Sequence, residues 1–213
     1  GWAASLILFF GLRRVPVNLS RTGDLAALKP ALRSLFLPLL LITFFRNFML
    51  DSLVTYLPTY MSQQGSSLWL AGGALSILEF AGVAGALSSG PLSDRIGRKS
   101  ILLAATISSS ILLLLFLQVS GWLVVPLLLL LGFTALSSQP VLLAIVQDTL
   151  PEHRAMGNGL YMTISFLIRP IAILAIGALG DRGGLVSAYF WGAIISLLAI
   201  PAILALPGPF RKI

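Results

Sequence analysis

Gly90-Pro-Leu-Ser-Asp-Arg-Ile-Gly-Arg-Lys-Ser100 is the most specific string in the chain. It places one acid, three bases and two glycines between two long apolar runs, while the rest of the chain is mostly leucine, alanine and small polar residues. Charged residues confined to so short an interval predict a loop in water between two membrane-spanning segments. The sequence on both sides of the stretch is therefore expected to cross a membrane.

The composition favours a polytopic membrane protein. The chain has 213 residues, of which 57% are hydrophobic and 10% are charged, and its mean hydropathy is +0.98. A soluble domain of this length carries far more charge. We expect an all-α bundle, because a helix satisfies its own backbone hydrogen bonds in lipid. Six transmembrane helices are predicted, at residues 35–60, 68–92, 101–119, 123–147, 156–180 and 185–206.

The segments before and after the bundle divide the chain further. Residues 1–12 are apolar but too short to cross a membrane, so they are interpreted as the end of a truncated transmembrane helix. Residues 13–34 are predicted to be a basic linker and residues 207–213 a tail, flanking a bundle at 35–206. The chain is therefore expected to belong to something longer.

The loops alternate in charge, which predicts their orientation. Loops 61–67, 120–122 and 181–184 contain a single base, Arg182. The segments on the other side contain eleven of the 14 bases, namely Arg13, Arg14, Arg21, Lys29, Arg33, Arg95, Arg98, Lys99, Arg154, Arg211 and Lys212. The linker, the quoted loop and the carboxy terminus are thus predicted to be cytoplasmic, in the plasma (inner) membrane of a prokaryote.

The same distribution narrows the partners. The net charge of +7 is attributed to orientation and to contact with anionic membrane lipid, and no nucleic acid partner is predicted. The chain has no cysteine, and its one histidine, His153, lies in a loop without nearby ligands. We therefore predict no metal site and no cofactor.

Eight positions of the quoted stretch resemble, in order and spacing, the signature loop of the major facilitator superfamily: Gly90, Leu92, Ser93, Asp94, Arg95, Gly97, Arg98 and Lys99. The resemblance implies a transporter of twelve helices in two six-helix halves, with the signature on the cytoplasmic side. The order of a short apolar segment, a basic linker and six spans resembles the carboxy-terminal half. Residues 147–157 resemble the cytoplasmic end of helix ten in drug-efflux-like members, including the fosmidomycin-resistance type.

The chemistry of the loop predicts specific contacts. Gly90 and Gly97 allow tight turns or close approach, and Asp94 suits a helix amino terminus. Arg98 is expected to pair with Asp148, at the foot of another span. The resemblance implies a conformational latch in which Asp94 contacts the opposite half; the alternative is a solvated loop that only sets orientation. The predicted latch comprises Gly90, Asp94, Arg95, Gly97, Arg98, Lys99 and Asp148. A similar string at residues 180–184 is interpreted as an extracellular turn.

Four ionisable residues lie deep in the predicted spans: Arg46, Asp51, Glu79 and Arg169. Arg46 and Glu79 each lie about 17 Å into their helices, at a rise of about 1.5 Å per residue. Facing lipid would cost several kcal/mol each, so they are expected to face a cavity or one another. Sign and depth pair Arg46 with Glu79 and Asp51 with Arg169. Pro170 is expected to break its helix beside Arg169.

Polar residues at helical spacing accompany these charges, and they predict a cavity. Stripes run through Thr43, Asn47, Asp51 and Thr55, through Gly72, Ser76 and Glu79, and through Asn158, Tyr161, Ser165 and Arg169. The predicted substrate or proton pathway comprises Arg46, Asn47, Asp51, Glu79, Tyr161, Ser165 and Arg169. We hypothesise that Glu79 or Asp51 exchanges a proton during transport. The alternative is that the charges are structural clasps between helices.

The function predicted from the sequence is secondary active transport of a small molecule by alternating access, as proton-coupled efflux or exchange. The expected partners are the substrate, protons, lipid and a missing amino-terminal half, in the same polypeptide or in an associating chain. One alternative is a non-transporting scaffold or receptor that keeps the fold. An intramembrane enzyme is disfavoured, because Asp51 is the only aspartate at mid-depth and the only histidine lies in a loop.

Overall fold

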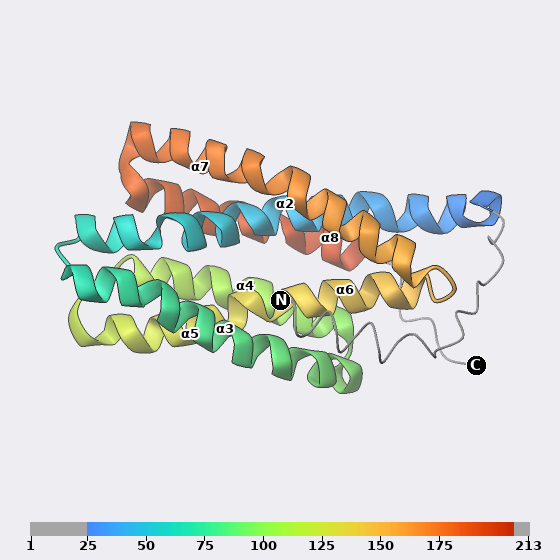
Figure 1. Ribbon diagram of the computed structural model, residues 1–213, viewed down its shortest axis with the longest axis horizontal. Helices are drawn as coiled ribbons and strands as arrows, with labels where there is room; N and C mark the ends of the chain where they lie inside the picture. Colours follow the sequence, from blue (N-terminus) through green and yellow to red (C-terminus); the bar gives the residue numbers. More distant parts are fainter. Residues whose placement is uncertain (1–24, 207–213) are drawn as a thin grey trace, which may run out of the picture. The chain divides into compact units, whose positions relative to one another are not determined.

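The computed structural model describes residues 25–206, with side chains from residue 35 onward; the predictions for residues 1–24 and 207–213 lie outside it. Within residues 31–206 the helices lie alongside one another (Figure 1). They are α2 (Leu25–Gln63), α3 (Leu68–Ile96), α4 (Arg98–Phe116), α5 (Val124–Leu136), α6 (Ser138–Thr149), α7 (Arg154–Leu197) and α8 (Ala199–Ala205), with a short 3₁₀ helix, η1 (Gly121–Leu123), before α5.

Five segments are long and apolar enough to cross a membrane, and the last of them crosses twice. They are Leu35–Gln63, Leu68–Ile96, Arg98–Phe116, Gly121–Thr149 and Arg154–Ala205. Gly184, with φ +80° and ψ 160°, folds α7 back on itself in a conformation that glycine adopts without steric cost (Figure 1). Gly192 of the second arm consequently lies against Ile176 of the first. The described residues thus form the predicted all-α bundle of six crossings.

The stretch from Gly90 to Ser100 is mostly helical, and the prediction of an open loop is wrong. Residues 90–96 complete α3, and Arg98 already begins α4. Gly97 alone leaves the helical conformation, with φ +108°. One glycine with a positive φ is sufficient to end one helix before the next begins. The charged residues on either side of Gly97 can stay helical, because the terminal turns of a helix accept charged side chains. Gly90 makes no close approach, because a Cβ atom built there would meet nothing within 4 Å.

Two further breaks differ from the predicted ones. The helix of the first arm of α7 continues through Pro170, where the expected break is absent. A membrane helix tolerates the loss of the one backbone hydrogen bond that an internal proline removes. The turn expected at residues 180–184 is confined to Gly184, because residues 180–183 are still helical.

The fourth crossing is broken at Ser137 into α5 and α6. Pro140 has no N–H group to donate to the carbonyl of Leu136, so the hydrogen-bond ladder is already incomplete there. The hydroxyls of Ser137 and Ser138 donate instead to the carbonyl oxygens of Thr134 and Ala135, at 2.8 and 3.0 Å. This crossing therefore has an interrupted hydrogen-bond ladder in the middle of the bundle, although Ser137 keeps helical dihedral angles (φ -60°, ψ -21°).

The closest helix contact joins α3 and α5 through glycines. A Cβ atom at Gly85 would overlap the carbonyl of Phe133, and one at Gly132 would overlap the carbonyl of Leu78. Small residues at such contacts let the two backbones touch, which supplies van der Waals energy that lipid cannot replace. The buried core lies beside this contact, and its largest fully buried side chains include Tyr189, Phe116, Met49, Leu78 and Leu128.

Replacing Gly85 with alanine is expected to lower the free energy of unfolding by about 1–3 kcal/mol, because the added methyl group forces α3 away from α5. Gly73→Ala is the matched control, since a Cβ atom there meets nothing within 4 Å on the same helix. The control should be neutral or stabilising by about 0.5–1 kcal/mol. Denaturant unfolding in micelles measures both, and equal stability of the two variants would contradict the close contact.

Candidate functional site

Asp51 and Arg169 form an ion pair across two helices in the middle of the bundle. The Nε atom of Arg169 lies 3.4 Å from Oδ1 of Asp51, so the pair expected from sign and depth is present. Arg169 lies 15 residues after the start of α7 at Arg154 and 14 before Gly183. At about 1.5 Å per residue it is therefore roughly 22 Å from either end of its helical arm.

The two partners differ in exposure. The side chain of Asp51 is 10% exposed and that of Arg169 is 51% exposed. The second carboxylate oxygen of Asp51, Oδ2, is buried and has no hydrogen-bond partner among the residues that the structure describes. Phe166 and Met162, on the same face of the helix as Arg169, are exposed apolar residues. The pair thus presents a half-exposed cation on an apolar wall and keeps the anion behind it.

The polar stripes on α2 and on the first arm of α7 belong to neighbouring helices that run in the same direction. The hydroxyl of Tyr56 donates to the carbonyl of Ile173 at 3.3 Å, about one turn beyond the Asp51–Arg169 pair on both helices. Thr43 is buried, Asn47, Tyr161 and Ser165 are half-buried, and Thr55 is exposed.

Two buried hydroxyls in these stripes have no hydrogen-bond partner within residues 35–206: those of Thr43 and Ser165. Nearer the start of α7, Asn158 accepts a hydrogen bond of 3.2 Å from the amide of Gln147 on α6. The predicted polar stripes are therefore present and lie mostly inside the bundle.

Arg46 does not pair with Glu79, so that predicted pair is wrong. Arg46 is 2% exposed, and its guanidinium donates to Thr106 Oγ1 at 2.7 Å and to the carbonyl of Ala135 at 2.9 Å. Ala135 is the residue whose carbonyl also accepts from Ser138 at the break between α5 and α6. The sign of a charge and its depth in the membrane do not say in which direction the side chain of Arg46 points around the axis of α2. They also do not reveal the backbone carbonyl that it contacts. Arg46 thus joins α2 to α4 and α5.

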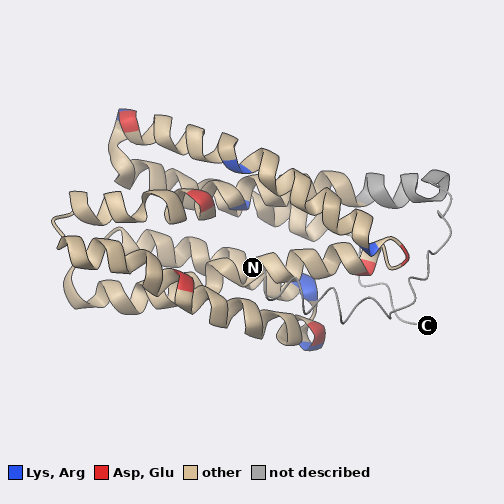
Figure 2. Cartoon of the chain, in the orientation of Figure 1, with Lys and Arg blue, Asp and Glu red and all other residues tan. Residues whose placement is uncertain are grey.

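Glu79 lies apart from the other mid-depth charges. It is half-buried on α3, and it forms no ion pair with any described residue. Gly72 and Ser76, its predicted stripe neighbours, are exposed on the same helix. Figure 2 shows how few charged residues lie in the middle of the helices.

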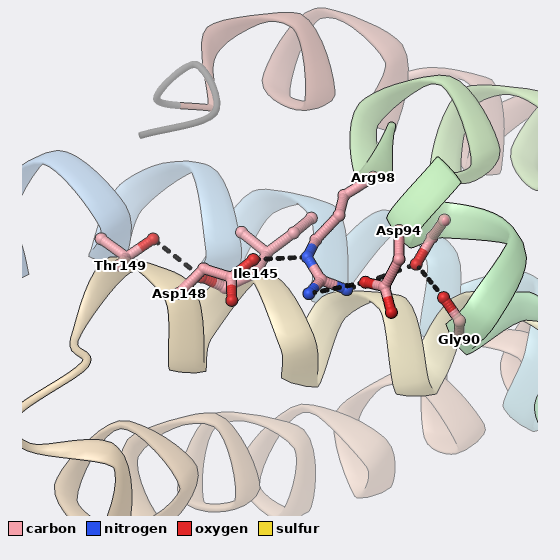
Figure 3. Close-up of polar contacts among 7 residues, drawn as sticks. Gly90, Asp94, Arg98, Ile145, Asp148 and Thr149 are labelled. Atoms are coloured by element: carbon pink, nitrogen blue, oxygen red, sulfur yellow. Dashed lines mark hydrogen bonds and ion pairs between the residues drawn. The ribbon is translucent and has the colours of Figure 1, made fainter. Parts of the chain in front are cut away.

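A second polar cluster lies at the end of the bundle that contains Arg95, Arg98, Lys99 and Arg154, here called the basic end. Arg98, the first residue of α4, lies between Asp94 and Asp148 (Figure 3). Its Nη2 atom is 3.0 Å from Asp94, and its Nε donates to Asp148 of α6 as expected. Its Nη1 donates to the hydroxyl of Ser93 at 3.3 Å. Arg98 therefore connects α3, α4 and α6.

The remaining predicted latch residues are less engaged. Lys99 donates to the carbonyl of Leu204 in the last turn of α8, at 3.3 Å. Arg95 is exposed and makes no ion pair in the described chain. Gly97 provides the break before Arg98, and Gly90 accepts the hydroxyl of Ser93 at 2.8 Å through its carbonyl.

The prediction from the sequence did not include several residues that make these contacts. Thr106 lies in the run Thr106-Ile-Ser-Ser-Ser110, which resembles any apolar span with small polar residues. The proline in the Ser-Ser-Gln-Pro string at residues 137–140 signalled an incomplete hydrogen-bond ladder in mid-span. The carbonyl that it leaves without a donor is that of Leu136, however, and Arg46 contacts the carbonyl of Ala135. No signal in the sequence indicated the contact of Lys99 with the carbonyl of Leu204, because every residue has a backbone carbonyl whatever its side chain.

Comparison with known proteins places the chain among membrane transporters. A family model described as Major Facilitator Superfamily matches residues 2–172 and, in an overlapping match, residues 83–212. The Fosmidomycin resistance protein of Escherichia coli (strain K12) is 26% identical over 163 residues, 76% of this chain and 40% of that protein. The Uncharacterized MFS-type transporter YfnC of Bacillus subtilis (strain 168) is 29% identical over 123 residues, 58% of this chain and 30% of that protein. The chain thus spans less than half the length of both relatives.

Thr106→Val is expected to lower the free energy of unfolding by about 1–3 kcal/mol, because it leaves a buried guanidinium donor of Arg46 without an acceptor. Thr134→Val is the matched control, since the hydroxyl of Thr134 bonds only to its own helix. Adding Arg46→Met to Thr106→Val should recover most of the loss. Unfolding in micelles measures all three, and a loss unaffected by Arg46→Met would refute the coupling.

Proposed function

Because the chain belongs to the Major Facilitator Superfamily, we propose that it forms one wall of a pathway through which a small molecule crosses the membrane by alternating access. The chain is an integral membrane protein with six apolar crossings. The proposed transport is proton-coupled efflux or exchange. A facing half-bundle, in the same polypeptide or in an associating chain, supplies the other wall.

The observation that carries this proposal is the half-exposed ion pair of Asp51 and Arg169. A cation at mid-depth that faced lipid would cost several kcal/mol, so a 51% exposed arginine there calls for an aqueous cavity on that side. The second wall encloses this cavity and leaves the pair accessible to substrate.

Asp51 is the proposed proton carrier. One of its carboxylate oxygens lacks a protein partner, and the other is held by a single arginine, so both charge states of the carboxyl group have support. Glu79 stays a second candidate, because it is half-buried at a similar depth without an ion pair to a described residue. The stripe residues Asn47, Tyr161 and Ser165 would line the path between Asp51 and the basic end, and Arg46 would hold the walls of the path together.

The cluster around Arg98 is the proposed conformational latch. Asp94 and Asp148 are both more than half exposed, so their ion pairs with Arg98 contribute little to stability and can break at low cost. Asp94 is also free on its exposed side to contact the second wall. The latch, on this proposal, sets which side of the membrane the pathway opens to, with Gly97 as the flexible point beside it.

Fosmidomycin is the first candidate substrate to test, because one relative is named a Fosmidomycin resistance protein. Accumulation in proteoliposomes that contain the intact transporter and an imposed pH gradient measures its transport directly.

Asp51→Asn is expected to abolish the dependence of fosmidomycin transport on the pH gradient, because an amide cannot exchange the proton. Glu79→Gln, the matched control at similar depth, is expected to keep that dependence. The reverse pattern would assign the proton to Glu79. Normal transport with unchanged pH dependence in both variants would remove both residues from the proton path.

Arg98→Gln is expected to slow transport roughly tenfold or more while changing the free energy of unfolding by less than about 1 kcal/mol, because exposed ion pairs contribute little to stability. Arg154→Gln, which removes an exposed base at the same end, is the control and should transport normally. The reciprocal exchange Arg98→Asp with Asp148→Arg should restore part of the rate. Initial rates in proteoliposomes decide this, and a normal rate in Arg98→Gln excludes the latch.

A further inference from the structure

The guanidinium of Arg169 has an unused edge. Its Nε atom faces Asp51, whereas Nη1 and Nη2 make no hydrogen bond to any residue in the described ranges. Half of the side chain is exposed. Arginine presents its donors in a planar fork, so the pairing with Asp51 fixes the direction of the free edge as well.

The charges around this edge favour an anion. On α2 and the first arm of α7, the mid-depth charges are Arg46, Arg169 and Asp51, which leave an excess of one positive charge. Arg46 is 2% exposed and its guanidinium is already engaged with Thr106 and Ala135, so it adds to the local potential without reaching a ligand. The apolar walls of low dielectric constant focus the field of such an excess into the adjoining cavity, which attracts a negative group.

The surface next to Arg169 is apolar. Phe166 and Met162, three and seven residues before it on the same helix face, are 70% and 52% exposed. A ligand that binds the guanidinium edge therefore also contacts hydrophobic side chains. Carboxylate, phosphate and phosphonate groups match the fork with two parallel hydrogen bonds.

We propose that the transported substrate is an organic anion whose carboxylate or phosphonate oxygens bind the Nη1–Nη2 edge of Arg169 while its apolar part contacts Phe166. Asp51 acts on this site as a positioning residue, because it holds Nε and orients the free edge. The inference rests on the proposed transport function and adds the charge class of the substrate.

The test compares probes that differ only in charge. Phenylphosphonate and phenyltrimethylammonium share the aromatic ring and carry opposite charges, and benzyl alcohol is the neutral reference. Thermal unfolding of the intact transporter in detergent is followed as each probe is titrated. Phenylphosphonate and fosmidomycin are expected to raise the unfolding temperature of the wild type, and the other two probes are not.

Substitutions then place the effect at the site. Arg169→Gln should raise the half-saturating concentration of phenylphosphonate by about tenfold or more. Arg169→Lys should recover only part of the lost affinity, because lysine keeps the charge but not the planar fork of donors. Arg182→Gln removes an exposed arginine from the same helix near Gly184 and should leave binding unchanged. Asp51→Asn should weaken binding less than Arg169→Gln, as expected for a residue that acts through another.

The outcomes separate this inference from the proposed function. Stabilisation by phenyltrimethylammonium, or equal anion binding in wild type and Arg169→Gln, overturns the anion site and leaves transport standing. Failure of both anions to stabilise the wild type also overturns it. Anion binding at Arg169 without flux in proteoliposomes would uphold the site and reject transport.

Discussion

The ion pair between Asp51 and Arg169 joins two helices that lie more than a hundred residues apart in the chain. Around it, the contacts between α2 and α7 are largely apolar, as in the cluster of Phe48, Ala172 and Ile176. Apolar side chains distinguish poorly between a neighbouring helix and lipid, so polar contacts carry much of the specificity of helix pairing in a membrane. Together, the ion pair and the hydrogen bond from Tyr56 to Ile173 set the direction and register of the two helices. The polar stripes of α2 and α7 therefore lie side by side.

Arg46 shows a different solution to the same constraint. A buried guanidinium without a carboxylate needs strong neutral acceptors, and the break at Ser137 supplies one by freeing a carbonyl of the fourth crossing. The break in turn gains a donor that an intact helix would provide itself. The cation and the break in the helix therefore stabilise one another. A charge used in this way is structural, which is the clasp that the sequence left open as an alternative.

The sequence was sufficient for the six crossings, because apolar runs of membrane length have few other solutions. It also placed Arg98 with Asp148 and Asp51 with Arg169, since each pair combines opposite signs at matched depth. It misplaced Arg46 because depth says nothing of direction around the helix axis: the guanidinium contacts Thr106 and Ala135, and Glu79 forms no ion pair with a described residue. Gly97, as the single non-helical residue of the signature stretch, depends on a backbone angle that composition does not reveal.

The contacts of Arg98 and those of Arg46 differ in the free energy needed to break them, and this difference bears on which part of the bundle moves more easily. Arg98 and Asp148 lie at the surface, where water replaces each partner and an ion pair contributes at most about 1 kcal/mol. Removing Arg46 from its acceptors would leave a buried cation unpaired, at several times that cost. The polar contacts between α4 and the fourth crossing are therefore easier to break at the basic end, where Arg98 joins α4 to α6, than at the level of Arg46, which joins α2 to α4 and α5. On the proposed latch, a change at Arg98 would act on the basic end of α6 and leave the buried contacts of Arg46 in place.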